Sequence, residues 1–335
     1  MDARRVQTWI AVVAGLALTG LLLVGGSALA DSPPGTVTSH QVRAAGWSSP
    51  WVSILPGNSQ VFHHNLGGNP DDYAVELMAW DDIIGFNRAN YGGLEDNGTW
   101  HGVHWQGLTS NTIEVHRQDD DTDADRVRVR VWQVPSPPDY DSGWTNINQG
   151  VTLPFTHDVG VNPMDLTVSL SFSGTDRGIH QYGYGGLDVD GLHHSLGALW
   201  RNLTTDTLEV TRGPNDTDAK QVRVVVVDGD PPHYDSGWQN IARGGSIALS
   251  HDLMWNPMML LVRGECYDTG ARGINQMYSG GNHNAQGYQG AHFESLTGIS
   301  VTVVRRTDDQ YCPQARVRIW KRAGHVYLPT ALRAS

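Results

Sequence analysis

The sequence predicts an all-β protein made of three tandem copies of one small antiparallel β-sandwich. Three observations lead to this prediction: a near-repeat of eleven residues, a set of equally spaced marker residues, and strand-like alternation without helical periodicity. The near-repeat is "YDSGWTNINQG" at 140–150, which returns as "YDSGWQNIARG" at 234–244. Two such stretches indicate internal duplication, and the marker residues reveal a further copy.

Equally spaced residues mark three copies. Trp51, Trp144 and Trp238 are separated by 93 and 94 residues. Each is followed, at identical distances, by a glycine, a histidine and a proline: Gly57, His64 and Pro70; Gly150, His157 and Pro163; Gly244, His251 and Pro257. A period near 94 is too long for a solenoid repeat and matches the length of a small domain. We therefore divide the chain into a leader (1–30), a linker (31–46), copy 1 (47–132), copy 2 (140–227), copy 3 (234–321) and a tail (322–335).

Each copy is expected to contain about six strands. The copies end on "VRVRVW", "VRVVVV" and "VRIW", and just before these come "TIEVHR", "TLEVTR" and "ISVTVVR". Such alternation of apolar and polar residues is typical of half-buried strands. Six short antiparallel strands in a domain of this length bury a core only as two packed sheets. The predicted fold of each copy is thus a six-stranded antiparallel β-sandwich.

The first thirty residues predict export. "DARR" supplies a basic start, and a long apolar run ends in Ala28-Leu29-Ala30, the small-x-small pattern that precedes signal-peptide cleavage. An uncleaved anchor helix is the competing interpretation. We expect a secreted or cell-surface protein, in which Cys266 and Cys312 form a disulfide.

The charge balance limits the partners. The chain carries 23 basic and 35 acidic residues, a net charge of −12, and has no basic tract. Nucleic acid and anionic membranes require a positive surface, so neither is an expected partner.

The order of motifs resembles the H-type lectin domain. In copies 2 and 3 a leading Gly-Trp precedes a strand, a proline turn and an apolar strand, and "GIHQ" or "GINQ" then precedes the closing strands. The resemblance covers most of each copy. It implies a six-stranded sandwich, binding of N-acetylgalactosamine-type sugars, and trimer assembly. Because one chain carries three units joined by short proline-rich segments, we expect a pseudo-threefold arrangement, with beads on a string as the alternative.

The closing loops depart from that family, whose ligand-contacting Trp and His lie between the last two strands. The corresponding loops read "RQDDDTDAD" (117–125), "RGPNDTDAK" (212–220) and "RTDDQYCPQ" (306–314). The candidate ligand residues here are Arg117 and Asp121, Arg212 and Asp216, and Arg306 and Asp308. Such side chains suit sugar hydroxyls, and their oxygens could also hold Ca²⁺, although the spacing is not that of an EF-hand. The alternative is a solvated acidic turn with an internal Arg–Asp pair.

A second candidate group precedes the Gly-Gly pair of each copy. It comprises Asn87, His180 and Asn275, their successors Arg88, Gln181 and Gln276, and the tyrosines Tyr91 and Tyr184. Amide, imidazole and ring groups beside a flexible turn fit a shallow polar pocket. The alternative is structural, with the amides satisfying the backbone of a bulged edge.

Other conspicuous residues are predicted to be structural. Trp105, Trp200 and Phe293 alternate with core positions and are expected in the core. A histidine that precedes a turn in each copy is expected to tie down the turn backbone; these are His64, His157 and His251.

Two function hypotheses follow. The first is a secreted, multivalent carbohydrate-binding protein without a cofactor, since duplication of a weak binder increases avidity. The second is an extracellular structural or adhesion module that self-associates or binds other proteins and no sugar. An enzyme is not expected, because the acids vary between copies (Glu114 and Glu209 become Thr302) and no nucleophile elbow is present.

Overall fold

The computed structural model describes residues 46–96, 99–134, 137–189, 194–270, 272–284 and 287–321. All of them belong to one compact unit, Ser39–Ser335. The predicted signal peptide, nearly all of the linker and the C-terminal tail lie outside the described residues. Among the residues described, no helix is both long enough and apolar enough to cross a bilayer.

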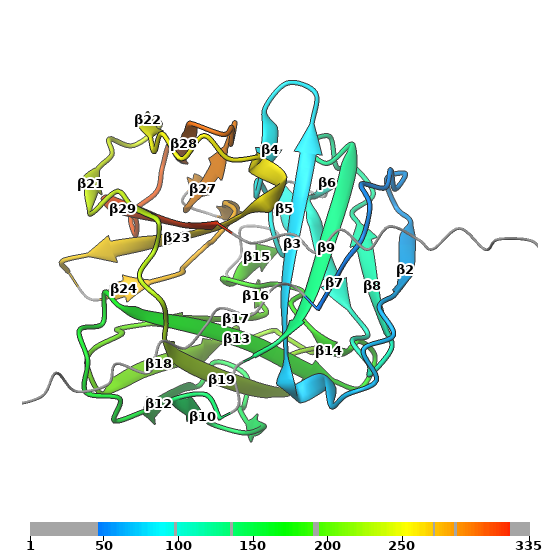
Figure 1. The fold of residues 1–335 in the computed structure, drawn as a ribbon. Helices are drawn as coiled ribbons and strands as arrows, with labels where there is room; N and C mark the ends of the chain where they lie inside the picture. The colour runs from blue at the N-terminus through cyan, green and yellow to red at the C-terminus, as the bar shows by residue number, and fades with distance from the viewer. Residues whose placement is uncertain are drawn as a thin grey trace, which may run out of the picture. The chain divides into compact units, whose positions relative to one another are not determined.

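The protein is all-β, and its sheets are antiparallel (Figure 1). The other regular elements in the described part of the chain are two 3₁₀ turns, η1 (Pro70–Asp72) and η2 (Pro257–Met259), each following an asparagine whose side chain caps it. This confirms the predicted class.

The same strand order occurs in all three copies, except that copy 1 has a single bridge, Val52 with Val127, where copies 2 and 3 have a second short strand. Copy 1 has the sheet β1 (Trp47–Ser48), β9 (Arg126–Gln133), β3 (Tyr73–Asp81), β4 (Gly85–Asn87), the sheet β2 (Ser59–His63), β8 (Thr112–Arg117), β7 (Val103–Gln106), and the hairpin β5 (Leu94–Asp96), β6 (Thr99–His101). Copy 2 has β10 (Tyr140–Asp141) and β11 (Thr145–Asn146) on β19 (Gln221–Asp228), then β13 (Leu166–Gly174) and β14 (Gly178–His180); its second sheet is β12 (Thr152–Thr156), β18 (Thr207–Arg212), β17 (Ala198–Arg201), and its hairpin is β15 (Leu187–Val189), β16 (His194–Leu196). Copy 3 has β20 (Tyr234–Asp235) and β21 (Gln239–Asn240) on β29 (Gln314–Lys321), then β23 (Leu260–Asp268) and β24 (Gly273–Asn275); its second sheet is β22 (Ser246–Ser250), β28 (Ser300–Arg305), β27 (Ala291–Glu294), and its hairpin is β25 (Asn282–Asn284), β26 (Gly287–Gln289).

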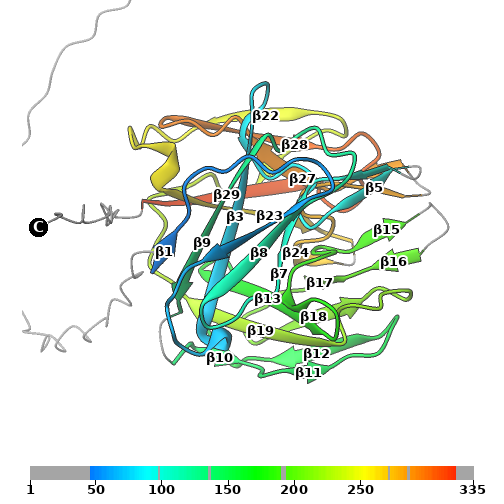
Figure 2. The same ribbon diagram turned by 90° about the vertical axis from the view of Figure 1, so that its right-hand side faces the viewer.

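The strands are more numerous per copy than the six expected. The additional ones include the hairpins, which follow the Gly-Gly pairs, whose glycines have positive φ that other residues rarely adopt. Strands β5, β15 and β25 of the three hairpins contact one another (Figure 2). The predicted alternation is found in β8, β18 and β28, where every second residue is buried.

The hydrophobic core extends across copy boundaries. One cluster combines buried residues of copies 1 and 2, including Trp105 and Trp200, each 1% exposed. A second cluster joins the core of copy 3, including Phe293, to Met78 and Phe86 of copy 1. The three aromatic residues are therefore core residues, as predicted.

Equivalent backbone hydrogen bonds connect every pair of copies. The amide of Gln181 donates to Trp105 O at 3.0 Å, and that of Gln276 donates to Trp200 O at 3.2 Å. The third contact, from Arg88 N to Phe293 O at 3.0 Å, links copy 3 back to copy 1. The contacts thus run from copy 1 to 2, from 2 to 3 and from 3 to 1.

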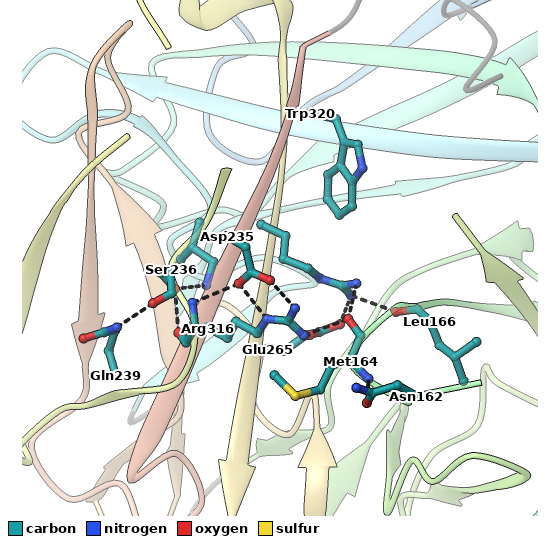
Figure 3. A network of polar contacts seen from close by, with 12 residues as sticks. Asn162, Met164, Leu166, Asp235, Ser236, Gln239, Glu265, Arg316 and Trp320 are labelled. Carbon is teal, nitrogen blue, oxygen red and sulfur yellow. Dashed lines mark hydrogen bonds and ion pairs between the residues drawn. The ribbon is translucent and has the colours of Figure 1, made fainter. Parts of the chain in front are cut away.

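A recurring arginine makes a second set of equivalent contacts between copies. Each reaches the carbonyl two residues after the Asn of the proline turn in the preceding copy, counting copy 3 as preceding copy 1. The pairs are Arg128 with Met258 O at 3.1 Å, Arg223 with Asp71 O, and Arg316 with Met164 O at 2.8 Å. Figure 3 shows the third pair, with Asp235 orienting the guanidinium of Arg316. Because the acceptor is a main-chain carbonyl, the contact tolerates Asp or Met at that position.

Cys266 and Cys312 form the predicted disulfide. It joins β23 to the closing loop that follows β28.

Candidate functional site

The Arg–Asp pair of the closing loop of copy 1 is buried. Arg117 donates from Nε to Asp121 Oδ2 at 2.8 Å and from Nη1 to Ile54 O at 2.9 Å. The other carboxylate oxygen, Asp121 Oδ1, accepts from Gly102 N at 2.6 Å, and Oδ2 also accepts from Ala124 N at 3.0 Å. Asp121 is 2% exposed. The internal pair considered from the sequence is present, but it holds the loop from inside rather than in solvent.

Copies 2 and 3 contain the same buried Arg–Asp pair. We call this pair, Arg117 with Asp121 in copy 1, the closing-loop lock. Arg212 Nε lies 2.7 Å from Asp216 Oδ2, and Arg305 Nε lies 2.7 Å from Asp309 Oδ2. The third lock therefore uses Arg305 and Asp309, not the predicted Arg306 and Asp308. Sequence comparison alone was ambiguous here because two arginines are adjacent, whereas the pairing of Arg305 with Ala291, like that of Arg212 with Ala198, settles the register.

In copies 1 and 3, an aspartate of the closing loop is hydrogen-bonded to the backbone of an aromatic residue in the hairpin. In copy 1, Trp100 N donates to Asp120 Oδ2 and Asp120 N donates to Trp100 O, both at 2.9 Å. In copy 3, Tyr288 N donates to Asp308 Oδ2 and Asp308 N donates to Tyr288 O, both at 3.0 Å. We call these two pairs the aromatic rim. It places an aromatic residue next to the closing loop of copy 1, which has none of its own, and adds one in copy 3 to the Tyr311 of that loop.

The aromatic rim combines two kinds of group that suit the recognition of a polyol. Asp120 is exposed, Trp100 and Asp308 are half-buried, and Tyr288 is 36% exposed. An amphipathic ring can cover the apolar face of a ligand, while a carboxylate accepts hydrogen bonds from its hydroxyls. Sequence reasoning missed Trp100 and Tyr288, although each lies two residues before a glycine at an equivalent position. Copy 2 has Ser195 and Asn215 there and so lacks the pair.

Arg306 points to a neighbouring copy rather than into the lock. Its Nη2 donates to Asn90 Oδ1 in copy 1 at 2.8 Å. Asn90 in turn donates to Asp123 Oδ2 at 2.8 Å, and burial raises the pKa of Asp123. Arg306 thus helps to close the junction between copies 3 and 1.

Asn87, His180 and Asn275 occupy equivalent buried bends and bond to backbone. The Oδ1 of Asn87 and of Asn275 each accepts from the amide two residues on, at 3.0 Å, and His180 Nδ1 does the same from Tyr182 N at 3.1 Å. Burial lowers the pKa of His180 to about 4, so the ring is neutral near pH 7. This geometry matches the structural alternative for these three residues.

The predicted tyrosines and glutamines meet between copies. Tyr91 donates from its hydroxyl to Gln181 Oε1, and Trp105 Nε1 donates to the same oxygen at 3.0 Å. Tyr184 and Trp200 make the same two bonds to Gln276. Burial raises the pKa of Tyr184 to about 12, so its hydroxyl stays protonated and remains a donor.

The junction between copies 3 and 1 differs from the other two. Ser279 and Phe293 replace the tyrosine and the tryptophan, and Arg88 replaces the glutamine. The smaller side chains leave a cavity of about 40 Å³ next to Arg88. The Arg88 guanidinium lies 3.8 Å from the centre of the Tyr91 ring.

The recurring histidines tie down turns, as predicted. His64 Nδ1 accepts from Leu66 N at 3.3 Å, His157 Nδ1 from Val159 N at 3.4 Å, and His251 Nδ1 from Leu253 N at 3.3 Å. Burial lowers the pKa of all three.

Within the described ranges, no group of three or more His, Cys, Asp or Glu side chains is placed to hold a metal ion. Comparisons of the chain with protein-family models, curated proteins and solved structures found no match. The candidate site therefore rests on its own geometry.

Proposed function

We propose that the chain is a secreted, multivalent carbohydrate-binding protein and not an enzyme. The observation that carries this proposal is the aromatic rim, in which a ring and a carboxylate are placed by identical backbone bonds in copies 1 and 3. The aspartates of the rim belong to the closing loops, which correspond to the loop where H-type lectin domains bind sugar, and the aromatic residues come from the adjacent hairpins. Binding needs no cofactor in this scheme, because hydroxyls are recognised by ring and carboxylate directly.

The proposal includes the arrangement of the copies. Each would be a six-stranded sandwich with an added hairpin, and the three would surround a pseudo-threefold axis as a one-chain equivalent of a lectin trimer. The equivalent backbone bonds among all three pairs of copies support this arrangement. Small-angle scattering tests it: residues 31–335 should give a radius of gyration near ~19 Å, the value for a compact chain of this length. An elongated profile with a clearly larger value contradicts it.

A glycan array probed with residues 31–335, with and without Ca²⁺, tests sugar binding. We expect binding to neutral or amino sugars, weakened by Trp100→Ala or Tyr288→Ala and abolished by both changes, since two weak sites act together. Trp255→Ala is the matched control, because Trp255 is 40% exposed but lies on a different loop. A silent array, or equal binding by the double variant, contradicts the proposal.

One observation favours the second hypothesis, a module that binds protein partners. Met254, Trp255 and Ile299 of copy 3 are exposed apolar residues on adjacent loops, joined by the bond from Trp255 N to Gly298 O at 3.3 Å. Exposed apolar patches of this kind are frequently interaction sites. A silent glycan array together with self-association that is lost in Trp255→Ser would favour this alternative.

A further inference from the structure

A second cavity of about 40 Å³ lies where the three copies meet. All three copies contribute residues from equivalent positions to its lining. These include Glu76, Arg88, Ser169, Gln181, Arg263 and Gln276. A volume of this size accommodates roughly two water molecules or one small ion, and is far below the ~300 Å³ of ordinary ligand pockets. It is too small for a sugar.

Two sets of equivalent positions give this cavity its charge. Glu76, Ser169 and Arg263 form one set, on β3, β13 and β23, where each faces the same position of the paired closing strand. Arg88 belongs to the other set, whose members in copies 2 and 3 are neutral glutamines. The amide nitrogens of those glutamines are engaged with backbone carbonyls. The lining thus holds two cations and one anion.

The single carboxylate in the lining is already paired. Glu76 Oε2 accepts from Arg130 Nη1 at 2.9 Å, and both side chains are buried. Glu265, the next acid on β23, is held by Arg318. In the described part of the chain neither Arg88 nor Arg263 lies within ion-pair distance of a carboxylate.

Neither arginine is paired with a negatively charged group of the described chain; the Arg88 guanidinium lies over the Tyr91 ring instead. Arg88 Nε is buried and finds no hydrogen-bond acceptor among the residues described. Arg263 bonds to Val168 O at 3.0 Å, a neutral acceptor. Burial is the main cause that lowers the pKa of Arg263; repulsion from Arg318 and Arg88 lowers it further, and Tyr184 and Glu265 offset part of the shift. Like charges that have lost much of their hydration repel strongly in such surroundings.

We propose that this cavity binds one small monovalent inorganic anion, of the size of chloride, between Arg88 and Arg263. The anion supplies the negative charge that the lining lacks and links copy 1 to copy 3 at the junction that has lost the Tyr–Gln–Trp contact. The site is independent of sugar binding at the aromatic rim.

Thermal unfolding at constant ionic strength, with chloride replacing gluconate, tests the site. Gluconate is too large for the cavity, so nonspecific screening is the same in both salts while only chloride can bind. We expect the melting temperature to rise with chloride, by about 2–4 °C at tenfold excess over the dissociation constant, and to keep rising with the logarithm of the chloride concentration above that. Equal melting temperatures in the two salts would overturn the proposal.

The variants Arg88→Gln and Arg263→Ser install the residues that stand at equivalent positions elsewhere in the chain. Each should fold and lose the chloride response, while Arg243→Gln, at an exposed position, should keep it. A variant that keeps the full response overturns the assignment of that arginine. Bromide-soaked crystals of the unaltered protein should show one anomalous peak between the two guanidinium groups, which tests the site even if a variant fails to fold. No peak there, or a peak without any chloride effect in solution, contradicts the proposal.

Discussion

The hydroxyl of Tyr91 donates a hydrogen bond to Oε1 of Gln181, a residue 90 positions later in the next copy. Trp105 donates to the same oxygen, which therefore accepts two hydrogen bonds. In the junction that lacks both donors, the acceptor is absent too and Arg88 replaces it. Donors and acceptor are thus present together or absent together, as expected when an unpaired buried polar group is costly.

Replacing Gln181 by Met should destabilise the protein by about 2–4 kcal/mol, because two buried donors lose their acceptor. Chemical denaturation measures the change. Gln310→Met, at an exposed position, is the control and should have little effect. Adding Tyr91→Phe and Trp105→Phe to Gln181→Met should recover part of the loss. A triple variant that is no better than the single one would contradict this account.

Removing the charge of the closing-loop lock should have a large effect. Asp121→Asn leaves Arg117 buried without its carboxylate, and we expect a loss of about 3–5 kcal/mol in the free energy of unfolding. Asp119→Asn, two residues earlier but exposed, should change it by less than about 0.5 kcal/mol. Similar urea midpoints for the two variants would show that the lock is not important for stability.

The disulfide should contribute to stability without being required for folding. The positions equivalent to Cys266 and Cys312 in copy 1 are Ala79 and Ala124, both buried. Changing both cysteines to alanine therefore recreates a pair that the fold already accommodates. We expect a folded protein that is about 2–4 kcal/mol less stable. Reductant should lower the melting temperature of the original protein and leave that of the variant unchanged; a response in both would contradict the prediction.

Stability should fall between pH 6.5 and pH 4. Burial lowers the pKa of His180 from 6.5 to about 4, so the unfolded chain binds this proton more tightly than the folded one. The contribution of neutral His180 is present above pH 6.5 and is lost as the pH falls through this window, by about 3 kcal/mol at most.

His180→Asn tests this, since asparagine occupies the equivalent positions 87 and 275. The variant should be stable at pH 7 and should show a flatter decline in melting temperature toward pH 4. An unchanged pH profile would mean that other histidines with lowered pKa, such as His104, account for the decline.

Met254→Gly should stabilise the protein. Met254 has φ of 49° and is 82% exposed, whereas Gly67 and Gly160 adopt this conformation in the other copies. Relief of left-handed strain should outweigh the added freedom of the unfolded chain, for a net gain of about 0.5–1 kcal/mol. The reverse change, Gly160→Met, should be destabilising. An added Cβ there meets nothing within 4 Å, so the cost comes from the left-handed backbone conformation alone. A melting temperature that falls in Met254→Gly would contradict this.

The sequence by itself determined the local features of this protein. Side chains that alternate along "TIEVHR" and "TLEVTR" have a preferred face in any packed sheet, so the strands and the buried Trp105 and Trp200 followed from the pattern. The turn histidines could also be predicted, because they bond to backbone a few residues away. The disulfide could be predicted because the chain has two cysteines.

Only the tertiary structure decided how residues from different copies meet. Gln181 has no partner nearby in the sequence. Its role as a hydrogen-bond acceptor is evident only when Tyr91 and Trp105 of the preceding copy lie against it. Likewise Trp100 reaches Asp120 only once the hairpin folds against the closing loop. The burial of Arg117 was not evident from the sequence either, because the acidic loop around it is typical of a surface turn. Hydrogen bonds and charges act over a few ångströms in space, and separation along the chain does not report that distance.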